Sequence, residues 1–235
     1  MSIIIPAHNE GAGIGRLLSV LADPYHPQTR LDVIVVCNGC TDDTADIARG
    51  WAPAVEVIEL SEASKQAALA AGNAAARFPS RMYCDADVII DADGVGRLVD
   101  ALADGVLAAA PRRRLDIAVS AWPVRAYYRF WERLPQVRND LFGRGVIALS
   151  PEGAARVQLL PRVMSDDLAV SEAFTAEERR VVDDVEVVVT GPRTVGDLIR
   201  RRTRVATGNR QLDRLGLRGA SARTGLGSVG RLVRD

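Results

Sequence analysis

The sequence predicts an α/β fold built on a doubly wound, mostly parallel sheet. Short apolar runs alternate with amphipathic or Ala-rich stretches through four predicted strands. Chains that alternate in this way form parallel strands joined by right-handed crossovers, with helices on both faces of the sheet. A length of 235 residues is enough for one sizeable core and short for two. We therefore expect a single domain over residues 1–215.

Residues 1–93 hold the four predicted strands. "SIIIP" is the first, and "GIGRLLSVLAD" behind it repeats apolar residues at helical spacing. "LDVIVVC" is the second, and residues 41–43 are helix-start signals. "VEVIEL" is the third and precedes the Ala-rich helix "KQAALAAGNAAARF". "RMYC" is the fourth and leads directly into Asp85.

The pattern is less regular over residues 94–215. "GVGRLVDALAD" predicts a helix, and "VLAAA" predicts a strand that "PRRRLD" interrupts. "VRAYYRFWERL" predicts a helix, "GVIALS" a strand, and "PEGAARV" a helix with Pro151 near its first turn. "SDDLAVSEAF" predicts a helix with Ser165 as N-cap, "VEVVV" a strand, and "TVGDLIRRRTRVATGNRQL" an Arg-rich helix. Residues 216–235 are dominated by Gly, Ser and Arg, so we expect a loosely ordered tail.

Composition excludes several classes of protein. The formal net charge is zero, so the chain exerts no long-range attraction on nucleic acid, and no nucleic-acid partner is expected. No apolar run reaches the roughly 20 residues that span a bilayer, and a signal-peptide pattern is missing, so we expect a cytoplasmic protein. Three cysteines do not make a disulfide framework. Lys65 is the only lysine.

Two carboxylates follow the fourth strand. Asp85 and Asp87 are two residues apart, so in extended backbone they project to the same side. Like charges repel, which makes such a pair unfavourable as structure, but it suits a hard divalent cation of the kind that accompanies phosphates. The competing interpretation is a solvated acidic turn. The nearby pair Asp91 and Asp93 fits the cap of a helix beginning near Gly94.

A glycine-rich turn follows the first strand and suggests a dinucleotide site. Gly11, Gly13 and Gly15 stand there, but Arg16 occupies the position of the third glycine in the Gly-x-Gly-x-x-Gly fingerprint. The second strand also ends in "VVCNG", without the acidic residue that the fingerprint requires. The sequence therefore disfavours a dinucleotide site.

The cysteines suggest two further sites. Cys37 and Cys40 have thioredoxin-like placement between strand and helix, and Cys84 with His8 could complete a zinc set. Cysteines at strand ends are more often small buried thiols. We therefore expect Cys37 and Cys40 to be structural and reduced.

Six segments stand in a distinctive order: "IIIPAHNEG", "VVCNGCTDDT", "SKQAALAAGNAA", "CDADV", "LFGRGVIALS" and "SDDLAVS". Each is a weak match by itself. In this order they resemble the motifs of the family 2 glycosyltransferases, which are inverting enzymes with the GT-A nucleotide-diphospho-sugar fold.

The resemblance implies a donor site in residues 1–93. It places Ala7, Asn9 and Glu10, in the Pro-x-x-Asn-Glu turn, near the nucleoside. It places Asn38 against the base, although Asn replaces a common Asp of the family. "SKQAALAAGNAA" resembles the family's Gly-Lys-x-x-Ala-x-Asn helix and gives Lys65 a place beside the nucleotide.

The resemblance also implies a metal ion and phosphate ligands. "CDADV" matches the Asp-x-Asp motif, so Asp87 is the first expected ligand of Mg²⁺ or Mn²⁺. Asp85 is either a second ligand or a contact to the ribose or to a metal-bound water. Arg202 and Arg204 join Lys65 as candidates to bind phosphate, with a solvated helix face as the alternative for the two arginines.

Residues 94–215 are implied to form the acceptor side. "LFGRGVIALS" resembles the family's Gly-x-Gly strand below the acceptor. "SDDLAVS" resembles the segment that supplies the general base, so Asp167 is the expected base and Asp166 its neighbour. The alternative for this pair is two acids favoured at a helix N-terminus.

The implied activity moves a sugar from a UDP- or GDP-sugar to an acceptor hydroxyl. Acceptors in this family are often lipid-linked, so the Arg-rich stretch after Thr194 and the tail are candidates for peripheral membrane contact. Residues 201–205 depart from the Gln-x-x-Arg-Trp motif of processive synthases, so processivity is not implied. A sugar nucleotidyltransferase, a glycoside hydrolase and a catalytically silent nucleotide-binding protein remain alternatives.

Overall fold

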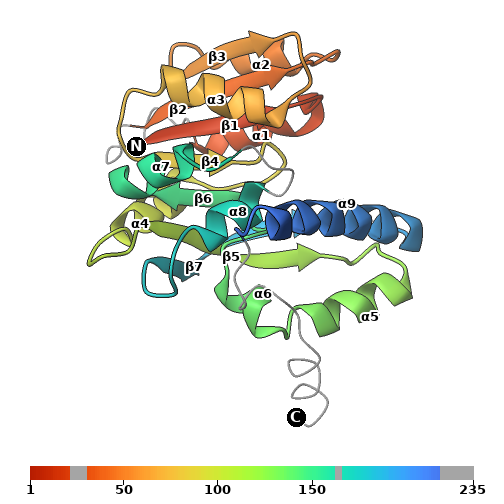
Figure 1. Ribbon diagram of the computed structural model, residues 1–235. Helices are drawn as coiled ribbons and strands as arrows, with labels where there is room; N and C mark the ends of the chain where they lie inside the picture. Colours follow the sequence, from red (N-terminus) through yellow and green to blue (C-terminus); the bar gives the residue numbers. More distant parts are fainter. Residues whose placement is uncertain (22–30, 162–165, 218–235) are drawn as a thin grey trace.

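The computed structural model describes residues 1–21, 31–161 and 166–217 (Figure 1). The N-terminal elements are β1 (Ser2–Ala7), α1 (Gly11–Leu21), β2 (Asp32–Asn38), α2 (Thr44–Arg49), β3 (Val55–Leu60), α3 (Lys65–Ala75), β4 (Arg81–Cys84) and α4 (Ala92–Asp100). The C-terminal elements are β5 (Ala108–Asp116), α5 (Trp122–Trp131), α6 (Pro135–Asn139), β6 (Val146–Leu149), α7 (Pro151–Gln158), α8 (Asp166–Glu172), β7 (Arg179–Thr190) and α9 (Val195–Arg214).

One mixed sheet has the strand order β3-β2-β1-β4-β6-β5-β7. The first four strands are parallel to one another, which confirms the predicted alternation. β6 runs antiparallel between β4 and β5, and β7 runs parallel to β5 at the edge. The fold is therefore doubly wound and mostly parallel, with one reversed strand in the half that was expected to hold the acceptor.

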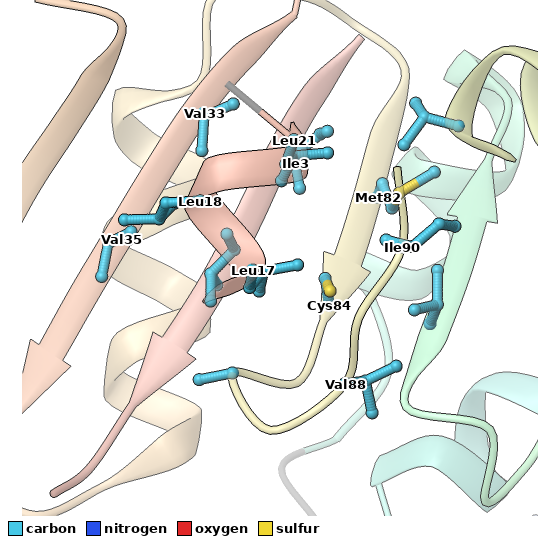
Figure 2. Packing of buried hydrophobic residues seen from close by; sticks show 14 of the residues in the cluster. Ile3, Leu17, Leu18, Leu21, Val33, Val35, Met82, Cys84, Val88 and Ile90 are labelled. Atoms are coloured by element: carbon cyan, nitrogen blue, oxygen red, sulfur yellow. The ribbon is translucent and has the colours of Figure 1, made fainter. Parts of the chain in front are cut away.

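Helices cover both faces of the parallel strands. Leu17, Leu18 and Leu21 of α1 pack on the face that includes Ile3 and Val33 (Figure 2). On the opposite face, α3 packs through Ala68 against β2. Strands buried on both faces read as continuous apolar runs, which is why "SIIIP" and "LDVIVVC" lack alternation.

The prediction that "PRRRLD" interrupts a strand is wrong, because β5 continues from Ala108 through Pro111 to Asp116. Proline lacks the N–H that a strand ladder uses, and it is tolerated at bulges. The pairing of β5 with β7 shifts register between Pro111 and Arg112, since Pro111 faces Val182 and Arg112 faces Glu186. The bulge in β7 therefore accommodates the proline and lets β5 present the next three arginines.

Helix caps follow the predicted signals closely. Asp91 is the N-cap of α4 and accepts a hydrogen bond from Gly94 N at 2.7 Å. Asp42, one of the signals before α2, accepts a hydrogen bond from Thr44 Oγ1 at 2.5 Å. The predicted N-cap Ser165 lies outside the described residues, as does the predicted tail beyond residue 217.

The long helix α9 spans the C-terminal half (Figure 1). Near its start Leu198 packs with Val124 and Tyr128 of α5, and near its end Leu212 packs with Leu168 of α8. One side of α9 therefore packs on α5 and α8, while its other side, with Ile199 and Arg204, is exposed. Within the three described ranges, no helix is long and apolar enough to span a membrane.

Candidate active site at the carboxyl ends of the strands

The loops after β1 and β2 form one hydrogen-bonded unit. Asn38 Nδ2 donates to Ala7 O at 2.8 Å, and Asn9 Oδ1 accepts from Thr41 N at 2.8 Å. Asn9 has a φ of 56°, a left-handed conformation that Asn tolerates better than most residues. Glu10 N donates to Thr44 Oγ1 at 2.8 Å. The predicted nucleoside residues are thus brought together, but the buried Asn38 amide nitrogen is already used by the protein, and its contact with a base stays a prediction.

A pocket of about 440 Å³ opens beside this unit. It is lined by Cys37, Gly39, Cys40, Thr41, Glu59, Leu60 and Ser61, which come from the ends of β2 and β3. Gly39 N donates to Leu60 O at 2.8 Å, so the two strand ends are held together at the pocket. The lining mixes apolar surface with a carboxylate and hydroxyl groups.

Two carboxylates, Asp85 and Asp87, follow the end of β4. Lys65 Nζ lies 2.8 Å from Asp85 Oδ1. Loss of hydration raises the pKa of Asp87, the Asp85 charge raises it further, and Lys65 and Arg201 act to lower it. Loss of hydration also raises the pKa of Glu10, with the charges of Asp87 and Asp85 among the further causes. Glu10 therefore shares one electrostatic environment with the predicted metal ligands.

Asp85 and Asp87 suit a metal ion that brings further ligands with it. No group of three or more His, Cys, Asp or Glu in residues 1–21, 31–161 and 166–217 is arranged to hold an ion by itself. The like-charge repulsion that raises the pKa of Asp87 would be relieved by a cation next to Asp87 and Asp85. Mg²⁺ commonly binds through one or two carboxylates while phosphate oxygens and water complete its coordination. The site therefore fits an ion that arrives with a diphosphate.

Residues 143–145, with the sequence Gly-Arg-Gly, are hydrogen-bonded both to the residue after β4 and to α8. Asp85 N donates to Gly145 O at 2.7 Å, and Gly143 N donates to Asp167 Oδ2 at 2.8 Å. Gly145 has a φ of +72°, and a Cβ there would lie 2.4 Å from Val88 Cγ2, so this position requires glycine. The other carboxylate oxygen of Asp167 accepts from Leu168 N at 2.8 Å. Asp166 is the first residue of α8.

Arg144, between the two glycines, holds this segment in place. Its guanidinium donates to Asp140 O at 2.9 Å, to Pro111 O at 3.0 Å and to Arg138 O at 2.7 Å. Burial lowers the pKa of Arg144 to about 10. Because its donors are used by backbone carbonyls, Arg144 is a structural residue and not a ligand contact.

Arg113 belongs to the site although sequence reasoning missed it. Its Nη1 donates to Gly143 O at 2.9 Å, and its guanidinium lies 4.6 Å from the Trp131 ring centroid. Burial lowers the pKa of Arg113, Glu132 opposes that shift, and the Arg201 charge adds to it. Its buried Nε has no hydrogen-bond partner among the residues that the structure describes. Arg113 was missed because "PRRRLD" was expected to interrupt the strand.

Arg201 is the second missed residue. Its Nη1 donates to Thr190 O at 3.4 Å, and its charge acts on the pKa values of both Asp87 and Arg113. The two predicted phosphate ligands of α9 are placed differently: Arg202 lies 5.9 Å from the Tyr127 ring, and Arg204 is exposed. Their role toward phosphate stays a prediction.

The cysteines match a structural role. Cys37 is buried, and burial raises its pKa to about 12. Burial also raises the pKa of Cys84, and all three described cysteines are free thiols. His8 Nδ1 lies 2.7 Å from Asn38 O, and no zinc-type cluster occurs in the described part of the chain. Buried thiols with raised pKa values are poor nucleophiles.

Comparison with known proteins identifies the family. The sequence profile described as "Glycosyl transferase family 2" matches residues 2–155. Glycosyltransferase AglE of Haloferax volcanii is 36% identical over 74 residues, which are 31% of this chain and 24% of that protein. The chain thus spans about a quarter of the length of AglE.

Solved structures support the same assignment. Mannosyltransferase PcManGT of Pyrobaculum calidifontis, in complex with GDP-Man and Mn²⁺, has a TM-score of 0.72 at 23% identity, over 99% of this chain and 67% of that chain. Glucosyl-3-phosphoglycerate synthase of Mycobacterium tuberculosis, in complex with Mn²⁺ and UDP-glucose, has a TM-score of 0.67 at 20% identity, over 93% of this chain and 80% of that chain. These likenesses show the GT-A fold, and because the family profile covers well over half of the sequence, the chain belongs to glycosyl transferase family 2.

Proposed function

We propose that the chain is a metal-dependent inverting glycosyltransferase that moves a sugar from a nucleoside diphosphate sugar to an acceptor hydroxyl. The observation that carries the proposal is the 143–145 segment, which hydrogen-bonds to Asp85 at one end and to Asp167 at the other. Three residues of backbone therefore connect the predicted metal-binding strand end to the predicted base. The residues proposed to bind the donor and the residue proposed to activate the acceptor would then lie in one site.

Asp167 is the proposed general base. Inversion in one displacement needs a group on the acceptor side that removes the hydroxyl proton as the oxygen attacks the anomeric carbon. A carboxylate offers roughly four lone-pair sites, so it can hold the N–H groups of Gly143 and Leu168 and still accept a proton. The bond from Gly143 orients the carboxylate, and the bond from Arg113 to Gly143 O orients Gly143 in turn.

The proposed donor site combines the carboxylates with nearby cations. Asp87, with Asp85 as the second carboxylate, would hold Mg²⁺ or Mn²⁺, which when bound would neutralise charge on the departing diphosphate. Lys65 and Arg201 would meet the phosphates, since both charges act on Asp87. Arg202 remains a further candidate for that contact, and Arg204, which is exposed, is the weaker one.

The nucleoside would occupy the region of Ala7, Asn9, Glu10 and Asn38, with its base in the pocket beside Gly39. Both of the solved structures described above are complexes with a nucleotide sugar and Mn²⁺. Their titles support a UDP- or GDP-sugar and a divalent ion as the ligands to test first. A lipid-linked acceptor and contact with a membrane face complete the proposal.

A thermal-shift panel tests it. UDP-, GDP- and other nucleotide sugars should raise the melting temperature of the chain with Mn²⁺ and not with EDTA, because a ligand that binds only the folded state stabilises it. Asp87→Asn should abolish the shift, whereas Asp46→Asn, which removes an exposed acid from α2, should retain it. Equal shifts with and without EDTA would refute the metal role. Binding without sugar transfer to any hydroxyl acceptor would favour a silent nucleotide-binding protein.

A further inference from the structure

An exposed apolar and basic face lies where α5 meets the start of α9. We call it the α5 face. Its apolar members are Val119, Trp122, Phe130, Val195 and Ile199, and its basic members are Arg125, Arg129, Arg133 and Arg193. Trp122 is 73% exposed, Val119 72% and Ile199 60%. Clusters of large exposed apolar side chains mark interaction sites, whereas isolated ones need no explanation.

Hydrogen bonds hold the two parts of the α5 face together. Ala121 N donates to Arg193 O at 2.9 Å, and Ser120 Oγ donates to Pro192 O at 2.9 Å. The loop before α5 is thereby attached to the loop before α9. Figure 1 shows α5 and one end of α9 on the same side of the molecule, beyond the end of β5.

The two sides of α5 differ sharply. The inner side packs through Val124 and Tyr128 on α9. The outer side carries Trp122, Arg125, Arg129 and Phe130 in turn, at spacings of three, four and one residues, which place them on one side of the helix. The exposed Arg133 follows the end of the helix. No acidic residue occurs within α5 itself. This pattern of aromatic and basic side chains is not explained by packing within the fold.

The charge of the α5 face is uncompensated. Within the described residues, none of its four arginines forms an ion pair. The acids nearby are engaged elsewhere: Asp197 bonds to Thr194 and pairs with Arg200, and Asp116 Oδ1 accepts from Ala118 N at 3.2 Å. Glu132 is only half-buried, and its charge acts on Arg113 inside the site. The occupant of this face therefore carries negative charge.

We propose that the α5 face docks on an anionic lipid bilayer surface. Trp122, Phe130 and Ile199 would enter the boundary between headgroups and acyl chains, while the arginines would stay at the lipid phosphates. A second copy of the chain that docked through the same face would bring the same positive charge to the contact, so it would not neutralise the arginines. Residues 218–235 contain four arginines and one aspartate, so they do not complement the face either. A bilayer presents phosphates directly above an apolar acyl-chain layer, which matches the combination of arginine and aromatic side chains on this face.

Docking in this way would bring the acceptor side of the site toward the membrane. Trp131, on the inner side of α5, lies under Arg113, which hydrogen-bonds to Gly143 beside Asp167. The inference rests on the proposed function only in assigning this surface to a lipid-anchored acceptor. The binding of the chain to lipid is separate from it and is measured separately.

Cosedimentation with vesicles tests the proposal. The whole chain should sediment with phosphatidylcholine–phosphatidylglycerol vesicles at low salt and not with phosphatidylcholine alone. Arg125→Gln with Arg129→Gln should weaken the partition by about fivefold per residue, and Trp122→Ser should weaken it at least tenfold. The matched controls are Arg16→Gln with Arg97→Gln, on α1 and α4, and Leu159→Ser, just after the end of α7; all three residues are exposed, and these changes should leave the partition unchanged.

A second measurement reports insertion directly. Trp122→Phe should retain sedimentation while losing the quenching of tryptophan fluorescence by spin-labelled lipid. Equal effects of the control variants, no sedimentation at low salt, or a dimer in ultracentrifugation that Trp122→Ser dissociates would each overturn the proposal. The nucleotide-dependent thermal shift of Trp122→Ser should equal that of the unaltered chain, so a failed proposed function and a failed docking surface give different results.

Discussion

The ammonium of Lys65 donates a hydrogen bond to Asp85 Oδ1 at 2.8 Å, so the only lysine of the chain contacts the carboxylate two residues before Asp87. Both side chains are about half exposed, at 46% and 42%, and pairs of this kind add little to stability. The effect of the pair is local, because Lys65 lowers the pKa of Asp87 against the loss of hydration and the Asp85 charge. The lysine therefore competes with any cation for Asp85.

Replacing Lys65 separates two roles. Lys65→Met should raise the affinity of the chain for Mn²⁺ alone several-fold, because a competing positive charge is lost. It should lower the affinity for a Mn²⁺–nucleoside diphosphate complex about tenfold, because a charge-assisted phosphate contact is lost. Lys65→Arg, which keeps the charge, is the control. If both affinities rise when measured by Mn²⁺ electron paramagnetic resonance, Lys65 does not reach the phosphates.

The arginines of α9 should differ in their effect on the donor. Arg201→Gln is expected to weaken nucleoside diphosphate binding about tenfold, because its charge reaches Asp87. Arg204→Gln, an exposed change on the same helix with the same loss of charge, should alter it less than about threefold. Titration calorimetry with Mn²⁺ present makes the comparison. A larger loss in Arg204→Gln would restore the sequence-based assignment and refute the placement of Arg201.

Asp32 should be the main electrostatic support of the first four strands. It is fully buried and accepts from Ser2 Oγ at 2.7 Å and from Arg77 N at 2.8 Å. Burial acts to raise the pKa of Asp32, but the bonds from Arg77 and Ser2 outweigh it, so the pKa is lowered. Asp32→Ala orphans these donors and should cost about 2 to 3 kcal/mol in urea unfolding.

A change in Arg77, the partner of Asp32, tests whether the buried carboxylate carries this stability. Arg77 is 66% exposed, so Arg77→Gln should cost less than about 1 kcal/mol, since its backbone N–H still reaches Asp32. Because the folded pKa of Asp32 is lowered, its contribution is present above the ordinary pKa of 3.8 and is lost as the pH falls through the folded value. Equal losses in the two variants would show that the ion pair, and not the buried carboxylate, carries the stability.

Asp140 should give the opposite pH dependence. Burial raises its pKa to about 6, against the attraction of Arg179, whose Nη2 lies 2.6 Å from Asp140 Oδ1. A carboxyl group with a raised pKa binds its proton more tightly in the folded state, so this contribution to stability falls as the pH rises from about 4 to about 6. A shift of about two units corresponds to about 3 kcal/mol over that interval.

Urea unfolding at several pH values between 4.5 and 7 measures this slope. Asp140→Asn should flatten the fall relative to the unaltered chain, because the amide does not titrate. Asp184→Asn, an exposed change on β7, is the control and should keep the slope. If Asp140→Asn and the unaltered chain show parallel curves, Asp140 does not titrate in this range.

Local patterns predicted the donor half well. Asp85 and Asp87 follow a buried strand directly, so their position depends only on the end of β4 and on its place in the sheet. The cap at Asp91 is likewise a contact over three residues. Each of these features depends on residues that are close together in the sequence, so sequence rules for strand ends and helix caps predict it.

The arrangement of residues 94–215 depends on contacts that no short segment contains. Arg113 enters the site only because a bulge in β7 lets β5 continue past Pro111. The charge of Arg201 acts on Asp87 because Leu198 and Leu212 pack α9 on α5 and α8. The use of the Asn38 amide by Ala7 O similarly depends on the pairing of β1 with β2. Sequence spacing identified the residue types but not which of them the fold brings together.

In the proposed mechanism Asp167 acts as the base, while Asp87 supports the donor. Asp167→Asn keeps the size of the carboxylate and removes its ability to take a proton, so donor binding should survive. The direct measurement is the rate of sugar transfer beside the dissociation constant of the nucleoside diphosphate with Mn²⁺, for Asp167→Asn and for the adjacent control Asp166→Asn. We expect a fall of about 10² to 10⁴ in turnover for Asp167→Asn with little change in the dissociation constant, and near-normal values of both for Asp166→Asn. Near-normal transfer by Asp167→Asn would contradict it.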